Sequence, residues 1–406
     1  MKKIYIVLVL LFGLILVGCT PTSSELPPLN ESDALDLTME EKYEMMQQIN
    51  FDDVEESGFR LDQFMKLDFA YESESDFTSE MYSMNQTSNG LLNVDYDASF
   101  YANLGASAND TVLYAGINKA IINATMESNL SQTGSGEDPL DQSSKDNYAL
   151  NITDSFLLLM DKIAYLKTNG SLLIENYVDD ELMLETKVDE SFTNIKEKSM
   201  MPVFTDEAYL EIKNQIAEMK SSVELLPEDM PTDAELDELM EELDAMVTVY
   251  QTGDVYTLRI LVNKVMIDTL IDQTFEMIML QIEAATADQI NSMTTLKALI
   301  KNALKSFEFD FRIEVKGPED GVKNLSKISL SVNGEFTGFT FDMAEFDEQA
   351  MPLRIDFGVT VEKFGFILDF NGAEPEFPTE AELAAYEAVE TPSIVELLEP
   401  EIPMIA

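Results

Sequence analysis

The chain has 406 residues and a formal net charge of −52, with 77 acidic residues, 25 basic residues and no histidine. This acidic excess argues against nucleic-acid binding, which depends on Lys and Arg neutralising phosphates. The lack of histidine excludes Ser-His-Asp and Cys-His catalysis, imidazole zinc sites and histidine pH switches, and we expect neither an enzyme nor a cofactor.

The N-terminus has the pattern of an export signal. Lys2 and Lys3 precede an uncharged apolar run over residues 4–17, and small Gly18 follows. This run is shorter than the roughly 20 residues of a membrane-spanning helix. The pattern predicts a signal peptide over residues 1–18.

Cys19, the one cysteine of the chain, directly follows this signal. The stretch Leu16-Val17-Gly18-Cys19 resembles the lipobox of bacterial lipoproteins. The resemblance implies cleavage before Cys19, a diacylglyceryl group on its sulfur, and a protein anchored on the extracytoplasmic side of the cell membrane. Two acyl chains give stable anchoring, at about 0.8 kcal/mol per buried CH₂. The alternative is an uncleaved signal anchor with an idle cysteine.

Residues 19–37 are rich in Pro, Ser, Thr and acidic side chains, which predicts a flexible tether. Residues 38–370 form the predicted body, as one large domain or two lobes. Thr38 and Glu41 predict a capping box that begins a helix. Residues 59–73 and 91–104 alternate apolar with polar side chains, which predicts antiparallel strands with one solvent-exposed face.

The middle of the chain mixes several patterns. A helix is predicted over residues 114–126, and a loop over the Ser-, Gly- and Asp-rich residues 131–147. Strands are predicted over residues 155–191, with a hairpin turn at Asn169-Gly170 and another turn at Asp179-Asp180.

Helices are then predicted after two capping residues, Thr205 and Thr232. A short strand at residues 254–262 precedes two further helices, over residues 263–285 and 287–305.

The last part of the body has the clearest strand pattern. Residues 307–315 place aromatic and aliphatic side chains on one face and charged ones on the other. A hairpin through Asn333-Gly334 and a strand over residues 352–370 complete the predicted sheet. Residues 371–406 read as an acidic, proline-containing tail with at most a short helix near residues 380–387.

These elements predict an α+β fold with a large, curved antiparallel sheet covered on one face by amphipathic helices. The pattern over residues 38–370 resembles the curved-sheet lipid and lipoprotein carriers of the LolA and LppX type. That resemblance implies that an acyl chain or lipid binds between the sheet and the helices. No diagnostic motif carries any family binding residue over to this chain.

Ten acidic residues lie between Glu224 and Asp244. They could gather Ca²⁺ or a cationic partner, because hard cations take several carboxylate oxygens. The alternative is that they form the solvent-exposed face of an amphipathic helix over residues 232–247. The absence of an EF-hand pattern favours this alternative.

The most specific hypothesis concerns an apolar ligand. The Met-rich helix 265–285 presents a wide apolar surface of the kind that adapts to varied ligands, although packing on the sheet explains it as well. We expect the ligand-binding site to be lined by Met266, Leu270, Phe275, Ile278, Phe307, Phe309 and Phe311. The predicted function is a membrane-anchored exported lipoprotein that binds a hydrophobic ligand or lipid. The alternative is an acidic structural or interaction lipoprotein of the cell surface without a small-molecule ligand.

Overall fold

The computed structural model describes residues 26–50, 58–78, 82–134, 140–184, 186–223, 246–281, 287–318, 321–342 and 353–390. These residues build one large, mostly antiparallel sheet of 14 strands that does not close on itself, and only 18% of the chain is helical. The fold is therefore mostly β. The large antiparallel sheet confirms part of the expectation, whereas the α+β class overstated the helices.

The strands are β1 (Ile49–Asn50), β2 (Phe59–Thr78), β3 (Tyr82–Asn103), β4 (Val112–Gly134), β5 (Leu140–Met160), β6 (Ile163–Val178), β7 (Glu181–Leu182), β8 (Val188–Ser199), β9 (Val247–Thr252), β10 (Val255–Asn263), β11 (Leu304–Lys316), β12 (Lys323–Asp342), β13 (Leu353–Asp369) and β14 (Glu387–Val389). The helices are η1 (Glu31–Asp33), α2 (Met39–Gln47), α3 (Asp206–Val223), α5 (Lys264–Gln281), α6 (Ala287–Ala303) and α7 (Glu380–Ala384).

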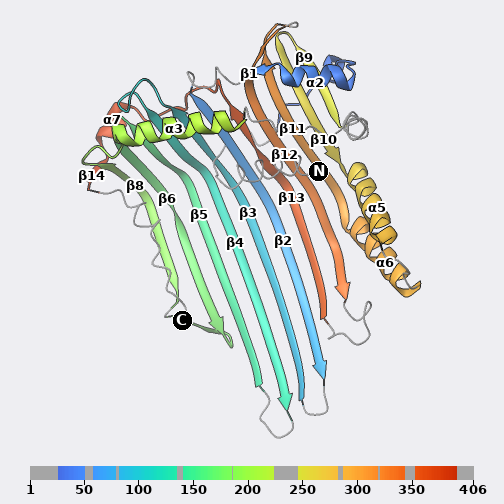
Figure 1. Cartoon of the computed structure of the whole chain (residues 1–406). Helices are drawn as coiled ribbons and strands as arrows, with labels where there is room; N and C mark the ends of the chain where they lie inside the picture. The colour runs from blue at the N-terminus through green and yellow to red at the C-terminus, as the bar shows by residue number, and fades with distance from the viewer. Residues whose placement is uncertain are drawn as a thin grey trace.

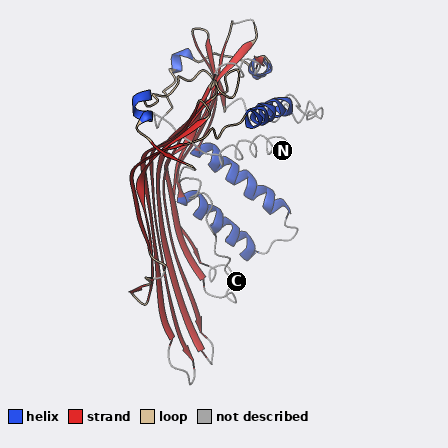
Figure 2. Cartoon of the chain, turned by 90° about the vertical axis from the view of Figure 1, so that its left-hand side faces the viewer, coloured by secondary structure: helices blue, strands red, loops and turns tan. Residues whose placement is uncertain are grey.

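The sheet runs in the order β14-β8-β6-β5-β4-β3-β2-β13-β12-β11-β10-β9, with β1 beside β12 and β7 beside β6 (Figure 1). Strands β2 to β5 have 20 to 23 residues each, which corresponds to roughly 70 Å at about 3.4 Å per residue. They bend together, so that the sheet has a concave and a convex side (Figure 2).

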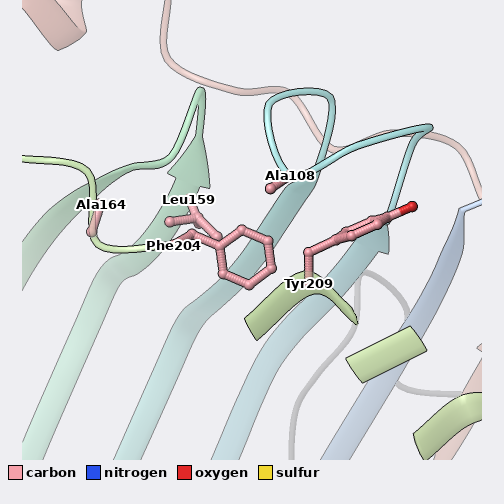
Figure 3. Packing of buried hydrophobic residues seen from close by; sticks show 5 residues of the cluster. All are labelled: Ala108, Leu159, Ala164, Phe204 and Tyr209. Atoms are coloured by element: carbon pink, nitrogen blue, oxygen red, sulfur yellow. The ribbon is translucent and has the colours of Figure 1, made fainter. Parts of the chain in front are cut away.

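Helices cover the concave side only in part. α3 lies across the upper ends of the strands, and α5 and α6 lie together at the β10–β12 edge (Figures 1 and 2). Under α3, Leu159 of β5 packs with Phe204 and Tyr209 (Figure 3). α7 lies on the convex side, where Leu383 packs on Leu158. Successive residues of β5 thus point to opposite sides, as the pleat requires.

Residues 114–126, expected to be a helix, belong to strand β4. Both edges of β4 are paired along almost their whole length, with β3 and with β5. These ladders satisfy the backbone that a helix would have satisfied internally, so tertiary pairing outweighs the local pattern. The loop expected over residues 131–147 is also largely strand, although residues 135–139 lie outside the described residues.

Neither Asn-Gly pair makes the expected hairpin turn. Asn169-Gly170 lies inside β6 and Asn333-Gly334 inside β12, and at both places the register to a neighbouring strand shifts. A Cβ at position 170 would collide with the carbonyl oxygen of Asn151, so this glycine permits a close approach of backbones. The turn at Asp179-Asp180 is confirmed, and both residues have positive φ angles of 50° and 63°.

The described part of the expected tether packs against the sheet. The guanidinium of Arg312 donates a hydrogen bond to the carbonyl of Pro27 (2.5 Å), and the N–H of Leu35 donates to the carbonyl of Val249 (2.8 Å). The edge of β9 and a buried arginine supply these partners, which composition alone does not reveal.

The expected acidic tail begins with a packed segment. Short helix α7 has a capping box between Thr379 and Glu382, and β14 pairs in parallel with β8. Leu383 and Tyr386 are buried against the convex side of the sheet. Residues 371–390 are therefore part of the fold, because two apolar anchors hold an otherwise acidic segment in place.

Several local predictions are confirmed. The capping box of Thr38 and Glu41 begins α2, and the Thr205 side chain accepts a hydrogen bond from the N–H of Ala208 at the start of α3. Helices α5 and α6 and strand β11 also lie where their patterns placed them. Residues 232–245 of the expected acidic helix lie outside the described residues, as does Cys19, whereas Val247, at the end of that prediction, begins strand β9.

Candidate ligand-binding face

The lower half of the sheet has two chemically opposite sides. In β2, Leu67, Phe69 and Tyr71 alternate with the polar positions Asp68 and Glu72. Residues that are paired in register on neighbouring strands share a side, so the pattern can be followed across the sheet.

The apolar positions extend over six strands and lie on the side of Leu159 and α3, which is the concave side. We call the following set the apolar face: Phe336, Phe339, Phe357, Val359, Leu67, Phe69, Tyr71, Val94, Leu92, Ile122, Met126, Leu150 and Tyr148.

The β12–β13 end of the apolar face is aromatic. Phe336 stacks on Phe357 with ring centroids 5.3 Å apart, and Phe339 approaches the same ring at 4.9 Å. Such contacts stabilise the sheet and present a smooth apolar surface.

The β4–β5 end of the apolar face is open to solvent. Met126 is 48% exposed and Tyr148 is 42% exposed. Within the described residues, the helices on this side contact only the upper ends or the β10–β12 edge. An apolar surface of this extent, left uncovered, is typical of a binding site.

Polar side chains bound the apolar face toward the strand tips. Ser73, Ser88 and Ser128 follow in register below it, and the hydroxyl of Tyr71 lies 3.2 Å from that of Ser88. Hydroxyl groups at this border could meet the polar part of an amphiphile.

The convex side of the same strands is acidic and hydrated. Lys119 pairs with Asp95, and Lys145 pairs with Glu127, whose pKa is lowered by the hydrogen bond from this lysine. Exposed pairs of this kind contribute little to stability but keep the surface soluble. The sheet therefore separates an aqueous side from an apolar one.

The predicted lining residues of β11 lie at the covered edge of the concave side. Phe311 is buried in a packed cluster with Leu330 and Phe366, and Phe309 packs against this cluster. Phe307 lies one pleat further along the same strand and is half-buried.

The predicted lining residues of α5 are spread around the helix. Met266 and Phe275 are half-buried, whereas Leu270 and Ile278 are exposed. Phe275 lines a hollow of about 380 Å³ between α5 and α6, together with Glu276, Met279, Met293, Thr294 and Lys297. This hollow lies between the two helices, whereas the expected site lay between helix and sheet.

Local sequence patterns did not single out Met126 or Tyr148. Residues 114–126 were expected to be helical, and Tyr148 follows the expected loop. The alternation of Ile122, Ala124 and Met126 with polar residues was the available signal, since a period of two residues indicates a strand.

No helix in the described part of the chain is long and apolar enough to cross a membrane. The described residues also contain no group of three or more carboxylates or thiols placed to hold a metal ion. The acidic stretch from Glu224 to Asp244, proposed as a Ca²⁺ or cation site, lies wholly outside them.

No known protein family model matches this chain, and no curated protein matches it. Among solved structures, a β-barrel-like protein of the domain of unknown function DUF1849 from Brucella abortus is similar over 74% of this chain and 98% of its own, with 8% identity and a TM-score of 0.13. The translocator domain of the autotransporter NalP from Neisseria meningitidis is similar over 81% of this chain and 94% of its own, with 5% identity and a TM-score of 0.11. TM-scores this low do not establish a shared fold.

Proposed function

We propose that this chain binds a hydrophobic ligand, the acyl chains of a lipid, along its apolar face. The observation that carries the proposal is the exposure of Met126 and Tyr148 on an apolar surface bordered by the carboxylate of Asp146, while the opposite side of the same strands is acidic. Apolar area removed from water contributes roughly 25 cal/mol per Å², so covering this face with acyl chains stabilises the complex.

The shape of the face favours an elongated ligand. It follows strands about 20 residues long and is open on one side, so an extended chain could lie along it. The hydroxyl border below Tyr71 would remain available to a polar headgroup.

Organic extraction tests this proposal. The full chain, expressed in its native envelope and purified, is extracted and the extract is analysed by mass spectrometry. We expect a lipid in near-stoichiometric amount beyond any group bound covalently to the protein. Finding none would count heavily against a lipid ligand.

We also propose that Cys19 carries a diacylglyceryl anchor, as its lipobox-like surroundings imply. The Cys19→Ala chain is expected to lose incorporation of labelled fatty acid and to leave the membrane fraction, since two acyl chains supply most of the membrane affinity. Fractionation and labelling measure both effects. A variant that stays membrane-bound would contradict the anchor.

The acidic convex side favours a second candidate, an interaction lipoprotein that contacts cationic partners or envelope polymers. Attraction between opposite charges drives such contacts, and salt screens it. This function predicts a pull-down whose yield falls as salt concentration rises and a purified chain that holds no lipid.

A further inference from the structure

Helix α5 presents an unusual outer surface. It lies beside α6 at the β10–β12 edge, on the concave side of the sheet (Figures 1 and 2). A surface helix ordinarily keeps its charged side chains on the face that points away from the protein. In α5 most charged side chains are instead held in ion pairs.

The central ion pairs join the two helices. Asp272 of α5 lies 3.2 Å from the ammonium of Lys297 and 2.7 Å from that of Lys301, both on α6. Within α5, Lys264 lies 2.6 Å from Asp268. These five side chains, three lysines and two aspartates, have a net charge of +1, and Glu276, beside Lys297 in the hollow, is a further carboxylate of α5.

Apolar side chains occupy the solvent-facing side of α5. Leu270 and Met277 are separated by seven residues, which places them on one side of the helix, and they are 42% and 56% exposed. The residues between them on this side, Gln273 and Thr274, are uncharged. Val265 is also exposed.

The helix pair carries little net charge for its length. Residues 264–281 and 287–303 contain three lysines and four carboxylates, so they account for only −1 of the net charge of −52. The acidic body is repelled by an anionic lipid surface, with a reach of about 8 Å at physiological ionic strength. The two helices can therefore approach such a membrane at low electrostatic cost.

We propose that the outer side of α5, through Leu270 and Met277, docks on the surface of a lipid bilayer. Interfacial helices bury apolar side chains about 5–10 Å into the boundary between headgroups and acyl chains. This inference goes beyond the ligand proposal and uses different residues. Docking there places the β10–β12 edge of the concave side next to the lipid.

A single tryptophan tests the docking, because the chain contains none of its own. The full chain carrying Met277→Trp is reconstituted with phosphatidylcholine vesicles whose acyl chains are brominated. We expect blue-shifted emission and at least about twofold quenching relative to vesicles without bromine, since interfacial insertion brings the indole to the bromine atoms.

Two matched controls carry the tryptophan at other exposed leucines, Leu91→Trp on the convex side and Leu210→Trp on α3. Both are expected to emit as in water and to remain unquenched. Equal quenching at all three positions would show non-specific adsorption and would overturn the proposal.

Three other results would also overturn it. The first is water-like, unquenched emission of the Met277→Trp chain in vesicles. The second is a blue shift without lipid that depends on protein concentration, which would indicate a second copy on α5. The third is a concentration-independent blue shift without lipid, which would indicate a segment of the same chain. None of these results depends on whether lipid is extracted from the apolar face, so the two proposals fail separately.

Discussion

Replacing Met126 and Tyr148 together by glutamate is expected to lower the lipid that co-purifies with the chain by about tenfold or more. The two residues lie on neighbouring strands of the apolar face, where Tyr148 pairs in register with Ala124. A carboxylate held against acyl chains loses its hydration, which costs several kcal/mol, whereas a tenfold loss of affinity needs only about 1.4 kcal/mol. Extraction and mass spectrometry measure the lipid-to-protein ratio.

The control for this variant is Leu91→Glu. Leu91 pairs with Thr125 of β4, one register step from Met126, but points to the convex side and is 55% exposed. It introduces one carboxylate at nearly the same height without touching the apolar face, so we expect unchanged lipid. Circular dichroism should show folded protein for both variants. Equal loss of lipid in the two variants would contradict binding on the apolar face.

Replacing Asp310 by alanine is expected to lower the free energy of unfolding by about 3–5 kcal/mol, the cost of breaking a buried ion pair from one side. The Asp310 carboxylate accepts hydrogen bonds from Arg312 (2.8 and 2.9 Å) and Arg259 (2.7 and 3.0 Å). The side chains of Asp310 and Arg312 are only 5% and 6% exposed. The variant leaves two guanidinium groups without their shared carboxylate, and denaturant unfolding measures the loss.

The same variant predicts a pH dependence. Burial alone would raise the pKa of Asp310, but the hydrogen bonds and charges of Arg312 and Arg259 outweigh it and hold this pKa below its usual value. A lowered pKa in the folded state stabilises the protein above the unfolded value of about 3.9, and this contribution is lost as the pH falls through the folded pKa. The stability difference between the native chain and Asp310→Ala should therefore be full at neutral pH and shrink below about pH 4.

Glu362→Gln is the matched control for Asp310→Ala. Glu362 pairs with Lys66 on the exposed surface, where solvent screens the interaction. We expect little change in its unfolding midpoint at any pH. A loss comparable to that of Asp310→Ala would show that net charge, and not the buried cluster, controls stability.

Local patterns located many of the elements correctly. The capping box of Thr38 and Glu41, the cap at Thr205 and the two-residue alternation of β11 all depend on neighbours within a few positions. Such signals are present in any short window of the chain.

Local patterns were wrong where distant partners decide the structure. Asn169-Gly170 is a strong turn signal, yet it lies inside β6 because Asn151 and Phe192 of the neighbouring strands approach there. The composition of residues 371–390 is typical of a disordered tail, yet Leu383 is buried against Leu158. Free energy from these contacts outweighs local propensity.

The candidate site shows the same division. The sequence pointed to Phe309 and Phe311 as apolar and to one side of a strand, and the structure places both on the concave side. The sequence could not show that Phe311 is buried by other side chains whereas Met126 is exposed to solvent. Cover depends on where α3, α5 and α6 come to rest on the sheet.

The sequence by itself determined the strong acidity, the lack of histidine chemistry, the position of the one cysteine and the two-residue alternation that makes a two-sided sheet. These are properties of composition and of short spacing. Only the tertiary structure decided the order of the strands, the register that gathers Met126, Tyr148 and Phe357 on one side, and the part of that side left open. The physical reason is that pairing and cover arise from contacts between residues far apart in the chain, whose energies no short stretch of sequence contains.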